Sequence, residues 1–206
     1  MRRSICVVLF LIAATLSGQT KMSSNEIAEF KAQVQQRASQ IQTISSDFVQ
    51  YKHLAFLSND IETSGSLKFK SPSTIKWEYL EPFQYAVLFK DEHMYINDQG
   101  KKSNIDIGSN ELFENLNTLI VNSIKGSMFD QEKFSITYSK VEGGTMVDFI
   151  PKNPAFSKYI KSFQIQFNKQ FDVEIFKMIE PTDDYTRIVF KNKVINTPIG
   201  DAVFTP

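Results

Sequence analysis

The feature that most constrains the fold of this sequence is a two-residue alternation of apolar and polar side chains. Ile75, Trp77 and Tyr79 alternate with Lys76 and Glu78. The same period recurs at residues 134–138, 163–167 and 187–191. Successive side chains of a strand point to opposite faces, so this pattern predicts an antiparallel sheet with one buried face and one face in water.

Turn-forming residues such as Gly143-Gly144 and Asp183-Asp184 divide the alternating segments into about eleven strands. The predicted strands cover residues 46–56, 60–70, 74–80, 84–90, 93–97, 101–107, 134–140, 145–151, 160–167, 172–180 and 185–195. A twisted sheet of this size tends to curl rather than remain flat. We therefore expect a curved sheet with a concave apolar face.

Two segments have the period of an amphipathic helix instead. Residues 23–44 place apolar side chains at steps of three and four, and Ser23 with Glu26 forms a capping box. Residues 109–126 repeat this pattern and end at Gly126. Two helices are too few to cover a flat sheet of that size. The expected fold is mainly β with α, an incomplete antiparallel half-barrel closed by a helical lid or plug.

The N-terminus has the order of a secretory signal peptide. Arg2 and Arg3 precede the apolar run "ICVVLFLIAATL", and "SGQT" follows it. The run is shorter than the about 20 residues that span a bilayer, which disfavours the alternative of an uncleaved anchor. We predict cleavage near Gln19, giving a signal peptide at 1–19 and one exported domain at 20–206.

The exported domain offers little chemistry for catalysis. Cys6 lies inside the predicted signal peptide, and loss of Arg2 and Arg3 leaves 21 basic against 23 acidic residues. No basic field would gather nucleic acid. His53 and His93 lack partners at ligand spacing, and phosphate loops and nucleophile elbows are absent. We expect that the protein is not an enzyme and that it binds no metal and no cofactor. An enzyme that uses a carboxylate pair for catalysis remains the open alternative.

The chain contains 18 phenylalanines, and an exported protein must bury most of these rings. Imperfect filling of a concave sheet leaves a hydrophobic cavity. The strand alternation, together with the apolar face of the predicted helix at 109–126, predicts the residues that line such a cavity. They are Phe48, Leu67, Phe69, Ile75, Trp77, Tyr79, Val87, Phe89, Leu116, Ile120, Phe149, Phe163, Ile165 and Phe190. The alternative is that the same side chains form a closed core.

Several short segments, in this order and spacing, resemble the LolA family of lipoprotein carriers. They are "ISSDFVQ" (44–50), "GSLKFKSP" (65–72), "IKWEYLEP" (75–82) and "DEHMYIND" (91–98), followed by matching segments to the end of the chain. The resemblance implies a periplasmic chaperone that shelters the acyl chains of lipoproteins. It also implies two partners, an inner-membrane releasing complex and an outer-membrane acceptor. We expect a monomer that binds no nucleic acid.

One family position differs. The family's arginine before the proline, which is linked to holding the lid shut, falls at Ser71 here. Lys70, Ser71 and Pro72 are expected at the lid or rim, but lid closure by that arginine does not carry over. The same fold serves carriers of other lipids, so a periplasmic carrier of a glycolipid or polyene-type lipid remains the alternative.

Overall fold

The computed structural model describes residues 19–106, 122 and 126–206 of the 206-residue chain. Almost all of the predicted signal peptide lies outside the described residues. So does nearly all of the predicted helix at 109–126, including Leu116 and Ile120. None of the helices among the described residues has the length and apolarity needed to cross a membrane.

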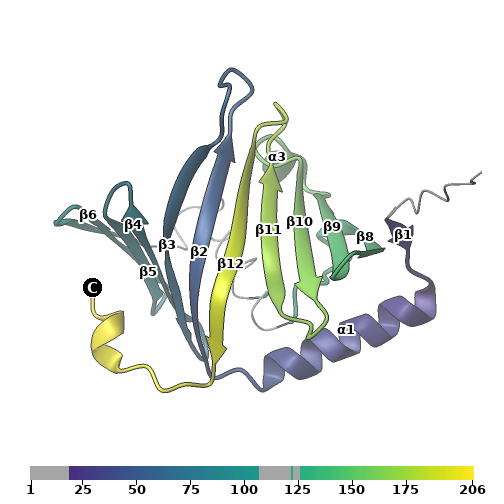
Figure 1. The fold of residues 1–206 in the computed structure, drawn as a ribbon, viewed down its shortest axis with the longest axis horizontal. Helices are drawn as coiled ribbons and strands as arrows, with labels where there is room; N and C mark the ends of the chain where they lie inside the picture. The colour runs from purple at the N-terminus through teal and green to yellow at the C-terminus, as the bar shows by residue number, and fades with distance from the viewer. Residues whose placement is uncertain (1–18, 107–121, 123–125) are drawn as a thin grey trace, which may run out of the picture.

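The fold is one open sheet of twelve strands with few helices (Figure 1). The strand order is β1-β8-β9-β10-β11-β12-β2-β3-β4-β5-β6-β7, and each neighbouring pair is antiparallel. The elements are β1 (Thr20–Lys21), α1 (Ser24–Ser39), β2 (Thr43–His53), β3 (Ile61–Lys70), β4 (Thr74–Glu81), β5 (Tyr85–Lys90), β6 (His93–Asp98), β7 (Lys101–Asp106), β8 (Phe134–Val141), β9 (Gly144–Pro151), α3 (Pro154–Ser157), β10 (Ser162–Asn168), β11 (Val173–Ile179), β12 (Tyr185–Ile195) and the 3-10 helix η2 (Asp201–Phe204). The predicted half-barrel is confirmed, and β1 is the strand that the alternation did not predict.

The first helix is shorter than its periodicity predicts. The sequence pattern extends the helix to Ile44, but α1 ends before Gln40, and Ile44 is buried in β2. The side chain of Asn196 supplies the physical reason. Its Oδ1 accepts a hydrogen bond from the backbone N–H of Gln42 at 2.7 Å, and its Nδ2 donates to the carbonyl of Gln40 at 2.8 Å. A residue that follows β12 therefore satisfies the backbone groups where the helix stops.

Two apolar clusters fill the concave face. The larger lies between α1 and strands β8 to β11, and Phe30 and Val34 enter it from the helix. The Phe30 ring meets Phe167 edge-on, with ring centroids 5.2 Å apart. The smaller cluster is built on β2, β3 and β4 around Ile75, which is fully buried. Burying one such side chain contributes about 2 kcal/mol, so α1 is held on the sheet mainly by apolar contact.

Gly65 of β3 allows close packing beside the smaller cluster. A Cβ atom at this position would lie 2.0 Å from the carbonyl oxygen of Glu78 and 2.8 Å from Cζ of Phe48. Phe48 can therefore lie across the strand and reach Trp77, with ring centroids 4.6 Å apart. Only glycine fits here, because a side chain would collide with both neighbours.

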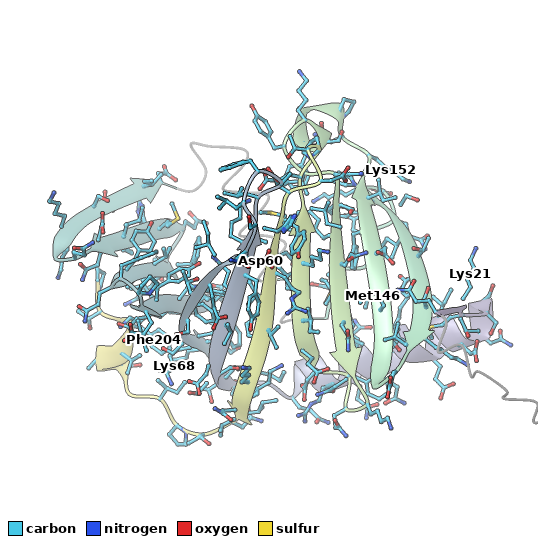
Figure 2. The ribbon with its side chains drawn as sticks, turned by 45° about the horizontal axis from the view of Figure 1, so that its top comes forward. Lys21, Asp60, Lys68, Met146, Lys152 and Phe204 are labelled. Atoms are coloured by element: carbon cyan, nitrogen blue, oxygen red, sulfur yellow. The ribbon has the colours of Figure 1, made fainter. Side chains whose placement is uncertain are left out.

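The C-terminal segment returns to the outer face of the sheet. Lys70 forms an ion pair with Asp201 of η2, and Lys90 donates to the carbonyl of Phe204 at 3.4 Å. Phe204 is buried, and Figure 2 shows it close to Lys68 of β3. The tail thus covers part of β4 and β5 on the face opposite α1.

Candidate functional site

An apolar pocket lies between α1 and the concave face of the sheet. Its volume is about 130 Å³. Val34, Ala38 and Ile41 contribute from the helix side, and the opposite wall comes from strands β2, β3, β4, β10, β11 and β12. Both walls are almost entirely hydrocarbon and aromatic. A pocket of this kind can hold an apolar chain but offers few directional bonds to it.

Four of the predicted cavity residues line this pocket, namely Leu67, Trp77, Ile165 and Phe190. They come from β3, β4, β10 and β12, which the curvature of the sheet brings together. The strand alternation predicts that Leu67 and Trp77 point inward and that Lys68 and Lys76 point to the other face. This placement is consistent with that prediction.

The other described cavity candidates lie in the surrounding core rather than on the pocket wall. Those in the smaller cluster are Phe69, Ile75 and Phe89, and those fully buried in the larger cluster are Phe149 and Phe163. Phe48 and Tyr79 contact each other, and Val87 lies opposite Trp77 in the strand register. These residues belong to the core that surrounds the pocket.

The indole N–H of Trp77 is a polar group within the apolar pocket wall. Its indole Nε1 is buried and forms no well-directed hydrogen bond with the described residues, although the Tyr79 hydroxyl is nearby. Tyr79 donates instead to Oε1 of Gln50 at 2.9 Å, and burial raises the pKa of Tyr79. Trp77 is the only tryptophan of the chain, so its emission reports on this pocket.

Charged residues stand at one side of the pocket. Arg37 of α1 donates through Nε and Nη2 to the two carboxylate oxygens of Asp172, each at 3.1 Å. This bidentate pair ties the helix to the start of β11, and the hydrogen bonds raise the pKa of Arg37. Lys193 of β12 donates to the carbonyl of Val173, and burial lowers the pKa of its ammonium group.

The same charged residues also line a second depression, of about 280 Å³, which we call the polar vestibule. It shares Arg37, Asp172 and Lys193 with the apolar pocket and adds Lys191 and Glu174. The pocket and the vestibule therefore meet at these shared side chains. Sequence reasoning did not find the charged residues, because they are distant in the chain and belong to no motif.

Residues 39–206 match the family model of the outer membrane lipoprotein carrier protein LolA. The chain belongs to the LolA family. The resemblance in the short motifs is thereby confirmed, and the family description indicates a carrier of lipid or lipoprotein. No curated protein sequence matches the chain significantly.

Solved structures with a similar fold are distant in sequence from this LolA family member. A LolA superfamily protein from Nitrosomonas europaea is 7% identical, with a TM-score of 0.45 over 85% of this chain and 97% of that one. The lipoprotein LppX of Mycobacterium tuberculosis is 8% identical, with a TM-score of 0.49 over 86% and 99%. MucB in the Pseudomonas aeruginosa MucA/MucB complex is 9% identical, with a TM-score of 0.47 over 88% and 61%.

In this LolA family protein the predicted rim residues lie near the C-terminal end of α1. Ser71 donates its backbone N–H to the carbonyl of Gln42 at 2.8 Å, and Ser71 and Pro72 line a small depression with Ala38. Lys70 points to the outer face and pairs with Asp201, whose pKa it lowers. The direct ion pair between α1 and the sheet at the pocket is made by Arg37, not by a residue at position 71.

The two histidines are placed away from this pocket. His53 stacks on Tyr185 with centroids 4.7 Å apart and bonds to Asp60, while His93 lies on β6 near Tyr95. Within residues 19–106 and 126–206, no group of three or more His, Cys, Asp or Glu side chains is placed to hold a metal ion.

Proposed function

We propose that this LolA family protein is a periplasmic chaperone that carries lipoproteins from an inner-membrane releasing complex to an outer-membrane acceptor. In this role the acyl chains of the cargo enter the apolar pocket beneath α1. The observation that carries the proposal is the pocket itself, whose wall joins the helix to six strands of the half-barrel. The role requires no covalent chemistry, and we propose that the protein is not an enzyme.

The energetics of an acyl chain fit a pocket of this composition. Withdrawing a chain from water contributes about 0.8 kcal/mol per methylene, or about 12 kcal/mol for sixteen carbons. Water alone does not extract the chain from such a site, so delivery requires an acceptor that shelters it equally well. Walls without strong directional bonds let the chain leave when such an acceptor is present.

The size of the pocket implies that α1 moves. Ligand pockets for molecules of this size usually exceed about 300 Å³, whereas the pocket has about 130 Å³. The wall formed by Val34, Ala38 and Ile41 belongs to or follows the helix, so displacement of α1 widens the pocket directly. We propose that α1 serves as the lid and that cargo binding displaces it.

Depletion of the protein in its own organism tests this role. We expect outer-membrane lipoproteins to accumulate at the inner membrane, measured by membrane fractionation and detection of several lipoproteins. Re-expression of the wild-type chain should restore their distribution. An unchanged distribution would refute lipoprotein transport and favour the alternative, a carrier of another lipid with the same fold.

A further inference from the structure

The apolar pocket and the polar vestibule together have the shape of a site for an amphiphile. Arg37, Asp172, Val173, Phe190 and Lys193 belong to both depressions. A ligand with its chain in the pocket therefore places its polar end among these charged groups. The chemistry of the vestibule then selects the head group.

Lys193 is the half-buried lysine of the vestibule, whereas Lys191 is exposed. Its Nζ donates to the carbonyl of Val173, and no carboxylate of the described residues forms an ion pair with it. Asp172, which lines the vestibule beside it, already uses both carboxylate oxygens on Arg37. Burial lowers the pKa of Lys193, which means that its charged form loses hydration that the protein only partly replaces.

Arg37 has one further donor nitrogen. Its Nε and Nη2 are engaged by Asp172, whereas Nη1 forms no hydrogen bond within the part of the chain that the structure describes. The vestibule thus contains three cations, Arg37, Lys191 and Lys193, against the two acids Asp172 and Glu174. A bound anion would balance this excess of positive charge, whereas a further cation would increase it.

We propose that the polar vestibule binds the anionic head group, a carboxylate or a phosphate, of an acyl ligand whose hydrocarbon chain lies in the apolar pocket. Lys193 makes the principal contact, and Arg37 contributes Nη1. The inference rests on the proposed function in requiring that an acyl chain enter the pocket. It goes beyond that function, because the lipid anchor of a lipoprotein carries neither a carboxylate nor a phosphate, and it names anionic lipids as a further class of ligand.

Binding of matched ligands to the purified exported chain tests this inference. Palmitate is compared with methyl palmitate, and a monopalmitoyl glycerol phosphate is compared with monopalmitoyl glycerol, all below their aggregation concentrations. A charge-assisted hydrogen bond in a half-buried site predicts that one or both anions bind about tenfold more tightly than their neutral partners. The pair that shows the difference identifies the head group as a carboxylate or a phosphate.

Lys193→Met keeps an apolar stem of similar length and removes the charge. We expect it to abolish the preference for the anion while the affinity for the neutral ligand is unchanged, which also shows that the variant is folded. Lys193→Arg should retain the preference. Lys101→Met, which removes an exposed lysine of β7 far from the site, is the matched control and should behave as the wild type.

The outcomes separate this inference from the proposed function. Equal affinity for charged and neutral ligands in the wild type, or a preference that survives in Lys193→Met, overturns the head-group site while leaving the apolar pocket intact. Failure of all four ligands to bind overturns the acyl-chain pocket itself.

Discussion

Arg37 is the side chain that joins α1 to the sheet beside the apolar pocket. Its two hydrogen bonds to Asp172 form one bidentate ion pair, and the Asp172 side chain is only 11% exposed. The Arg37 side chain is 35% exposed, so solvent screens part of this attraction. The pair therefore positions the helix, and its partial exposure is compatible with the proposed displacement of α1 by cargo.

Replacement of Arg37 by Met should loosen α1 without removing its apolar contacts. We expect the closed form to lose about 1 kcal/mol of stability, which corresponds to a roughly fivefold larger population of the open form. Hydrogen exchange of the α1 amides and the association rate of an acyl ligand would both report this change. Arg187→Met is the matched control, since Arg187 lies over the Tyr51 ring on another part of the sheet. Unchanged exchange and association in Arg37→Met would show that this pair does not hold the lid.

At the level of single residues, the sequence predicts the apolar side chains of the pocket better than the charged side chains of the polar vestibule. Alternation alone places Leu67, Trp77, Ile165 and Phe190 on the inner face, because the strand period determines where side chains point. The partners Arg37 and Asp172 are 135 residues apart. No local pattern relates them, because their contact depends on how the whole sheet curves under the helix.

The start of α1 is fixed by a different set of contacts. Glu26 accepts hydrogen bonds through Oε2 from the backbone N–H of Ser23 at 2.9 Å and from its hydroxyl at 2.8 Å. Its other carboxylate oxygen pairs with Lys140 of β8. These contacts, that of Lys140 foremost, lower the pKa of Glu26 to about 2. The first turn of the helix is thus tied to the sheet at the end opposite Arg37.

This contact predicts a pH-dependent contribution to stability. A carboxylate with a lowered pKa in the folded state stabilises the fold fully above its unfolded value, near 4.5, and the contribution is lost as pH falls toward 2. The Tm difference between wild type and Glu26→Gln should therefore be largest above pH 4.5 and shrink below it. Glu29→Gln, a change in an exposed carboxylate of the same helix, is the control. A difference that stays constant from pH 7 to pH 2.5 would contradict the assignment.

At the level of elements, strand existence is predictable and helix length is not. The eleven alternating segments all form strands, because one buried face imposes a period of two. The apolar periodicity continues to Ile44, but the helix ends earlier, because the side chain of Asn196 bonds the backbone groups that follow it. The turn-length pieces β1, α3 and η2 contain too few residues to show a period.

At the scale of the whole molecule, the sheet and α1 are held together by different kinds of contact. The sheet is continuous from β1 to β7 through antiparallel pairs. Among the described residues, α1 rests on it through apolar contacts and the ion pairs of Glu26 and Arg37, and Asn196 bonds the backbone at its C-terminal end. A ligand that enters beneath the helix exchanges one set of apolar contacts for another. In the role that we propose, burial of the acyl chain offsets the free energy of displacing α1.

Quenching of Trp77 by a brominated acyl chain tests this account most directly. Bromine quenches tryptophan emission only at close range, and Trp77 is the only tryptophan in the chain. A synthetic lipopeptide with brominated acyl chains should quench the emission and saturate at one ligand per protein, while the same peptide without acyl chains should have no effect. Native mass spectrometry counts the bound ligand independently. Emission that remains unquenched while the lipopeptide is bound would place the acyl chains elsewhere and contradict the pocket beneath α1.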